Sequence, residues 1–132
     1  MAYLIDTDTI IFALRKDKSV LTKFEENKHI PISISMITYA ELLFGARRSQ
    51  NEQQNMIKVY HIRELYPIEA LNEGVMEIFA EIKAKMFSKG MRIEDMDLLI
   101  AATAIYNDLT LVTNNTKHFE KIPYLKLENW KS

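Results

Sequence analysis

Three acidic residues stand in strongly apolar stretches, where a solvated surface carboxylate is not expected. Asp6 ends the run AYLID, Glu41 lies inside MITYAELLFGA, and Asp97 opens DLLIAATAIY. If they converge, each close pair repels by about 4 kcal/mol at an effective dielectric of about 20, so the cluster must take up protons or bind a cation. Carboxylates without His or Cys nearby suit Mg²⁺ or Mn²⁺. Such an ion polarises a phosphodiester oxygen and lowers the pKa of a bound water, which is the chemistry of a metal-dependent nuclease.

Each acid also has a purely structural interpretation. Asp6 or Asp8 could cap the helix expected to start near Thr7. Asp97 could favour the positive end of its own helix, an effect of about 0.3 to 1 kcal/mol.

Glu41 could reach solvent or pair with Arg47 or Arg48. The three histidines show no metal-ligand spacing, and His118, which lies near Asn115 in the sequence, could at most contact a substrate. The convergent arrangement of the acids is more economical, because it explains all three with one site.

The elements that must position these residues alternate along the chain. We predict strands at 2–6, 31–35, 65–68, 110–113 and 124–127, and helices from Thr7 onward and at 18–28, 36–48, 51–63, 69–89 and 97–106. This alternation implies an α/β fold in which a central, mainly parallel sheet is flanked by helices on both faces. Pro67 places the third strand at an edge or a strand end. Ligands bind such sheets beyond the carboxyl ends of the strands, where Asp6 and Asn115 are expected.

Size and composition limit the alternatives. A chain of 132 residues that is 48% hydrophobic fits one domain spanning 1–132. It has no cysteine, which excludes disulfides and a cysteine nucleophile. The longest apolar run, from Leu98 to Tyr106, is far shorter than the roughly 20 residues of a membrane span. Asp6 and Asp8 interrupt any secretory signal. We therefore expect a cytoplasmic protein with no membrane contact and no nucleotide cofactor.

Charge gives no general attraction to a polyanion. The 17 Lys plus Arg and 18 Asp plus Glu give a formal net charge of −1, so nucleic acid contacts must be local. Arg47, Arg48 and Lys89 are the candidate RNA-binding residues, although charge runs of this kind are also typical of a solvated helix face.

Four blocks together resemble a known family. LIDTDTII, ITYAELLFGA, DLLIAATAIYNDLTLVTNN and HFEKIPYLKLENW occur in the order and spacing of PIN-domain ribonucleases of the VapC toxin group, from residue 3 to 130. The resemblance implies a three-layer PIN-like domain and a Mg²⁺- or Mn²⁺-dependent endonuclease that cleaves RNA, with transfer RNA as the target by analogy. It also implies a homodimer and a small antitoxin, of a type II toxin-antitoxin system, that blocks the active site.

The family's acidic positions fall on residues of this chain. The resemblance assigns Asp6, Glu41 and Asp97 to the metal, with Glu41 bound directly or through water. Asp8 takes the position that orients the first acid, and Thr113 that of a hydroxyl residue beside the site. One carboxylate or the metal would activate water, leaving a 3′-hydroxyl and a 5′-phosphate.

The chain departs from the family pattern at the fourth acid. Asn115 occupies that position, and an amide can bind a metal-shell water but cannot accept a proton as a carboxylate does. Asn115 is therefore retained as a catalytic candidate, and Glu120 is the candidate to supply the missing charge. For the antitoxin, Phe12, Leu43 and Phe44 are candidate docking residues as well as core candidates.

Two other functions compete. Asp6-Thr7-Asp8-Thr9 matches the DxDxT opening of haloacid-dehalogenase-type phosphatases, in which Asp6 would be the nucleophile and Asp8 the acid/base; this leaves Glu41 without a function. Alternatively, the domain could bind RNA without cleaving it, having lost its chemistry through Asn115.

Overall fold

Five parallel strands form one sheet in the computed structural model, which describes all residues from Met1 to Ser132. The strands are β1 (Tyr3–Ile5), β2 (Ile32–Ser35), β3 (Ile68–Glu69), β4 (Thr110–Val112) and β5 (Lys126–Glu128). They lie in the order β3-β2-β1-β4-β5, and every neighbouring pair is parallel. This confirms the predicted parallel sheet and the edge position of the strand beside Pro67.

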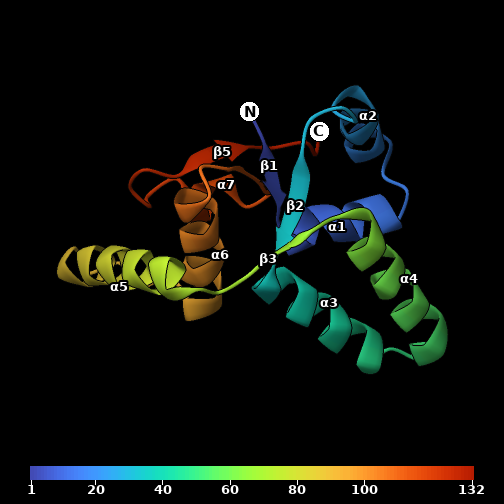
Figure 1. Ribbon diagram of the computed structural model, residues 1–132, viewed down its shortest axis with the longest axis horizontal. Helices are drawn as coiled ribbons and strands as arrows, with labels where there is room; N and C mark the ends of the chain where they lie inside the picture. Colours follow the sequence, from blue (N-terminus) through green and yellow to red (C-terminus); the bar gives the residue numbers. More distant parts are fainter.

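Seven helices connect and cover the strands (Figure 1). They are α1 (Thr7–Leu14), α2 (Lys18–Glu26), α3 (Met36–Arg47), α4 (Glu52–Leu65), α5 (Glu73–Ser88), α6 (Asp95–Tyr106) and α7 (Thr116–Phe119). Side chains at the N-cap position accept a backbone N–H at the start of four of them: Asp6, Asp17, Ser35 and Asn72. These local hydrogen bonds fix where the helices begin. None of the helices is both long and apolar enough to span a bilayer.

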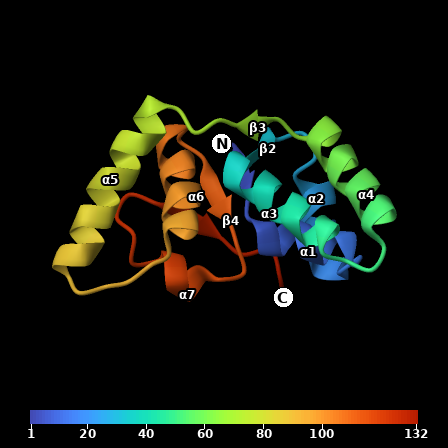
Figure 2. The same cartoon turned by 90° about the horizontal axis from the view of Figure 1, so that it is seen from below.

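The sheet separates two apolar clusters, one on each face. Successive side chains of β1 point to opposite sides: Leu4 belongs to the cluster with α5 and α6, whereas Tyr3 and Ile5 belong to the cluster with α1 to α4. Figure 2 shows α5 outside α6 on one side and α1, α3 and α4 on the other. The molecule therefore has the predicted three-layer α/β architecture.

Helix α6 is apolar around most of its surface because it is covered on two sides. Ile100, Ala101, Ala102 and Ala104 are all buried, between the sheet and the apolar residues of α5. A helix in such a position has no solvent face to make polar, which accounts for the unusual composition of the stretch that follows Asp97.

Several predicted boundaries were wrong. The third strand is Ile68–Glu69, because residues up to Leu65 continue α4. The long helix begins at Glu73 rather than at 69, after its cap at Asn72. Helix α6 begins at Asp95, so Asp97 lies in its first turn. The last strand is Lys126–Glu128, where it pairs in register with β4.

The strand order reverses between β1 and β4. From β1 the chain continues to β2 and β3 on one side, and β4 and β5 lie on the other. Residues that follow β1 and β4 therefore meet at the switch point of the sheet, where α/β proteins bind ligands. In this chain those residues are Asp6 and Thr113.

Candidate active site

Asp6 is fixed at the carboxyl end of β1 by three hydrogen bonds. Its own N–H donates to the Val112 carbonyl at 2.9 Å, which ties β1 to β4. The Thr7 N–H donates to Asp6 Oδ1 at 2.8 Å, and the Thr113 hydroxyl donates to Asp6 Oδ2 at 2.8 Å. Asp6 is the cap of α1, and it is only 7% exposed. The structural and the chemical interpretations of this residue are therefore both compatible with its position.

Asp8 joins the same network from the first turn of α1. Its Oδ2 lies 3.4 Å from the Thr113 hydroxyl and accepts the Asn114 N–H at 3.0 Å. The Thr113 hydroxyl in turn accepts the Asn115 N–H at 3.0 Å. Asp8 thus holds the turn after β4 against α1. It forms no hydrogen bond with Asp6 itself, and the orienting role predicted for it stays a prediction.

The charge state of Asp6 reflects this crowding. Burial, the negative charge of Asp8 and, to a smaller extent, that of Asp97 raise the pKa of Asp6 from 3.8 to about 7, against the hydrogen bonds from Thr113 and Thr7. A carboxyl group in this environment either keeps a proton near neutral pH or requires a cation.

Glu41 reaches the network through α1. Thr7 donates its hydroxyl proton to Glu41 Oε1 at 2.5 Å, and the Thr38 hydroxyl lies 3.1 Å from the same Thr7 oxygen. Glu41 is therefore bonded to the residue next to Asp6 in sequence. The alternative that it pairs with an arginine of its own helix is wrong, because Arg47 binds Glu52 at 3.0 Å and Arg48 stacks over Phe44 at 5.8 Å.

Asp97 is held by a residue that sequence reasoning did not assign to it. His118 Nε2 lies 2.9 Å from Asp97 Oδ2, with both side chains a little more than a quarter exposed. His118 belongs to α7, a four-residue helix that was not predicted. A His with no ligand spacing and no expected helix gave no sequence signal for this contact.

The acids are close neighbours but are not gathered as metal ligands. No group of three or more His, Asp or Glu side chains stands close enough together to hold an ion, so the expected convergence of Asp6, Glu41 and Asp97 is not met in this side-chain arrangement. Glu41 is bonded to Thr7, and Asp97 to His118. The premise that no His lies near these acids is wrong, because His118 contacts Asp97. The chemistry of the donors still fits Mg²⁺, because they are hard carboxylate oxygens and Asp6 is buried beside the charge of Asp8.

The remaining candidates lie at the periphery. Asn115 and Glu120 are exposed; Asn115 contributes its backbone N–H to Thr113, and neither side chain forms a hydrogen bond. Lys89 is the C-cap of α5, at the end of a helix that projects away from the sheet (Figure 1). The roles predicted for these three residues stay predictions.

Comparison with known proteins gives a consistent result. The model of the PIN domain matches residues 3–124. Ribonuclease VapC2 of Rickettsia felis is 36% identical over 98% of both chains. The tRNA(fMet)-specific endonuclease VapC of Salmonella typhimurium is 30% identical over 98% of both. A crystal structure of VapBC2 from Rickettsia felis, bound to a DNA fragment from its promoter, superposes with a TM-score of 0.93 at 34% identity, covering 99% of this chain and 100% of the other.

Proposed function

This chain belongs to the PIN-domain family of VapC-type ribonucleases, and from that premise we propose that it is a Mg²⁺-dependent endoribonuclease toxin, with Mn²⁺ as an alternative ion. The observation that carries the proposal is Asp6: a buried carboxyl at the switch point of the sheet, with a pKa raised to about 7 beside two other acids. Membership of this family argues against the phosphatase alternative. The catalytic roles of individual residues are for experiment to assign.

Asp6, Glu41 and Asp97 are the proposed ligands of the ion. When bound, the ion supplies charge neutralisation at the phosphodiester and a lowered pKa for water. The protein's own contribution is orientation: Thr113 and the Thr7 N–H fix both oxygens of Asp6. Thr7 holds Glu41 and His118 holds Asp97 by hydrogen bonds. These two hydrogen bonds must rearrange before Glu41 and Asp97 can reach one ion.

Besides the effect of the ion on the pKa of water, one carboxylate of this site can accept the proton of the attacking water. Asp6 and Asp97 are the candidates, since their charges are close enough to repel one another and each keeps an oxygen bonded to a donor that orients it. The products would carry a 3′-hydroxyl and a 5′-phosphate.

The proposal includes two protein partners. The matched Rickettsia felis structure is of a VapBC2 complex, which supports a cognate antitoxin for this chain, and we propose a homodimer as the assembly. The Salmonella typhimurium relative is named for tRNA(fMet), so initiator transfer RNA is the first substrate to try.

The test is cleavage of initiator transfer RNA and of total RNA by the purified chain with Mg²⁺, with Mn²⁺ or with EDTA. We expect cutting only with a divalent ion, and a loss of about a thousandfold in Asp6→Asn, because the amide keeps the cap but cannot carry the negative charge. Asp95→Asn is the matched control: Asp95 lies two residues from Asp97 on α6 but is exposed and paired with Lys83 at 2.8 Å.

Three results would contradict the proposal. Cleavage that persists in EDTA would show that the reaction does not need a metal ion. Cleavage by Asp6→Asn at the wild-type rate would show that Asp6 is not part of the active site. RNA binding without any cleavage by the wild-type chain would favour the non-catalytic alternative.

A further inference from the structure

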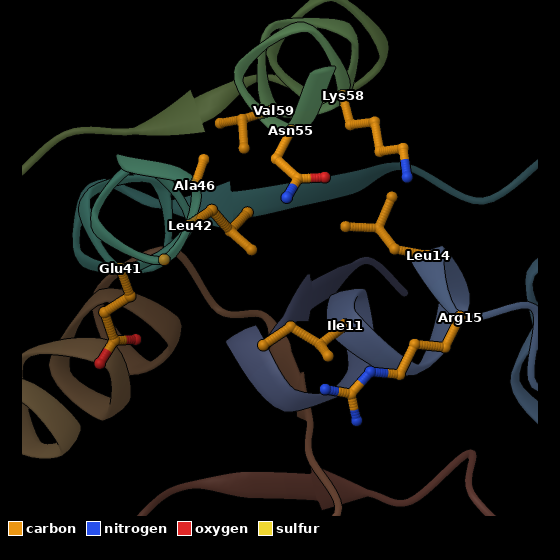
Figure 3. A pocket seen from close by; sticks show the side chains of 10 residues that line it. Ile11, Leu14, Arg15, Glu41, Leu42, Ala46, Asn55, Lys58 and Val59 are labelled. Carbon is orange, nitrogen blue, oxygen red and sulfur yellow. The ribbon is translucent and has the colours of Figure 1, made fainter. Parts of the chain in front are cut away.

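A pocket of about 310 Å³ opens between α1, α3 and α4, beside the acidic site. Figure 3 shows Glu41 at the left of this pocket, Lys58 at its upper right, and the guanidinium group of Arg15 at its lower edge, beneath Ile11. Between them the lining includes apolar side chains such as Leu42 and Val59, together with the polar side chain of Asn55. Glu41 also accepts the hydroxyl of Thr7, so the pocket is continuous with the acidic network.

Arg15 and Lys58 are cations without a partner in the folded chain. Seven of the 17 Lys and Arg residues form ion pairs with carboxylates, and neither of these two is among them. Neither stacks on an aromatic ring, and both side chains are exposed. Arg15 comes from the end of α1 and Lys58 from α4, so two positive charges without a partner line the same pocket from different helices. Such a pocket favours an anionic occupant.

The geometry of α1 sets the distance between this pair and the acids. The helix rises about 1.5 Å per residue, so Arg15, its C-cap, lies about 13 Å along the axis from Asp6, its N-cap. A stacked nucleic acid strand advances about 3.4 Å per nucleotide, which makes this distance about four nucleotides. A strand that is cut at the acidic site can therefore reach the cations with the phosphates that flank the cut.

We propose that this pocket binds the sugar–phosphate backbone of the RNA substrate on one side of the cleaved bond, with Arg15 and Lys58 binding phosphates. The inference rests on the proposed ribonuclease function. None of the ten lining residues is aromatic, so the pocket offers no platform on which a base could stack. It contributes affinity without reading the sequence.

The test measures binding of fluorescein-labelled, single-stranded RNA oligonucleotides of mixed sequence, from about four to about twelve nucleotides long, so that they span the expected reach of about four nucleotides. The Asp6→Asn chain in Mg²⁺ serves as background so that the probe is not cut. We expect Arg15→Gln and Lys58→Gln to weaken binding about tenfold each. The salt dependence should become shallower by about 0.7 in log–log slope for each phosphate that is no longer neutralised, and longer probes should lose their advantage over short ones.

The matched control is the double variant Lys16→Gln/Lys18→Gln. It removes the same charge just after α1 from residues that are exposed and do not line the pocket. We expect it to keep the length dependence and most of the affinity, because general attraction is weak in a chain of net charge −1.

Equal losses in the control and in the Arg15/Lys58 double variant would overturn the proposal, as would unchanged RNA binding in that double variant. Unchanged RNA binding together with weaker inhibition by the cognate antitoxin would also overturn it, and would assign the pocket to the protein partner. Failure of the proposed function is recognised separately, because the wild-type chain would then cut no RNA in Mg²⁺.

Discussion

The two ends of helix α1 carry opposite charges in different environments, one buried and one exposed. At its start, Asp6 is buried, bonded to Thr7 and Thr113, and repelled by neighbouring acids, so that its pKa is raised to about 7. At its end, Arg15 is exposed and unpaired. Both signs agree with the helix dipole, which favours anions at the N-terminus and cations at the C-terminus. The two ends differ in burial: the buried acid lowers the stability of the fold when it is ionised, whereas the exposed cation does not.

The largest expected effect is the pH dependence of stability in the metal-free chain. The pKa of Asp6 is 3.8 when unfolded and about 7 when folded, so the unfolded state loses its proton first. The folded state is therefore favoured most below about pH 4, where Asp6 is protonated in both states. The free energy of unfolding falls by about 4 kcal/mol as the pH rises from about 4 to about 7. Urea unfolding in EDTA at a series of pH values measures it.

Asp6→Asn isolates the contribution of this one group. The amide can accept the same cap hydrogen bond but does not ionise, so the variant should lose most of the decline between pH 4 and 7 and be more stable than wild type at pH 8. Mg²⁺ should restore stability to wild type at pH 8 more than to the variant. If the free energy of unfolding depends on pH in the same way in both chains, the pKa of Asp6 is not raised in the folded state.

A smaller effect is expected from Thr113→Val. The change removes the hydroxyl that donates to Asp6 Oδ2 while keeping the side-chain volume, and we expect a loss of about 2 kcal/mol in unfolding free energy at pH 8. The pKa of Asp6 should rise, because one of the hydrogen bonds that lower it is gone. Urea unfolding as a function of pH measures both.

Thr103→Val is the matched control for that experiment. Thr103 is fully buried on α6, and its hydroxyl donates to the Leu99 carbonyl at 2.8 Å rather than to an acid. The destabilisation it causes should be independent of pH between 4 and 8. If the two variants show the same pH dependence, Thr113 has no particular effect on Asp6.

The smallest effect is expected at the other end of the helix. Arg15→Gln and Lys58→Gln should change the unfolding free energy by no more than about 0.5 kcal/mol at any pH, since neither cation has a partner in the folded chain. Urea unfolding of the same chains used for RNA binding measures it. A decrease above about 1 kcal/mol would mean that these residues stabilise the fold, and the contrast between the two ends would fail.

Much of the fold could be predicted because its signals are local. The α3 helix was expected at 36–48 and is Met36–Arg47, since Ser35 caps it and apolar residues fill it. Gly90 was expected to end α5, and it has the positive φ of 70° that glycine adopts readily. The register of β5 depends instead on pairing with β4, and the short α7 depends on burial of Phe119. Those two elements were misplaced or missed, because their determinants are distant in sequence.

The candidate site divides in the same way. Which residues are acidic and lie in apolar surroundings is a property of the chain, and Asp6, Glu41 and Asp97 could be selected from it. The hydrogen-bond partners of these acids could not be predicted. His118 reaches Asp97 from α7, and Glu41 accepts a hydrogen bond from Thr7, although the sequence also allowed it to pair with Arg47 or Arg48.

The sequence by itself determined the alternation of strands and helices, the polarity of the strand ends and the chemical type of the donors, because each depends on neighbours within a few positions. Only the tertiary structure decided that Thr113 bonds an acid 107 positions away, that the Asp6 pKa rises to about 7, and that Arg15 and Lys58 line the same pocket as Glu41. Hydrogen bonding, desolvation and charge repulsion act through space, and the distances that govern them exist only after the sheet has assembled.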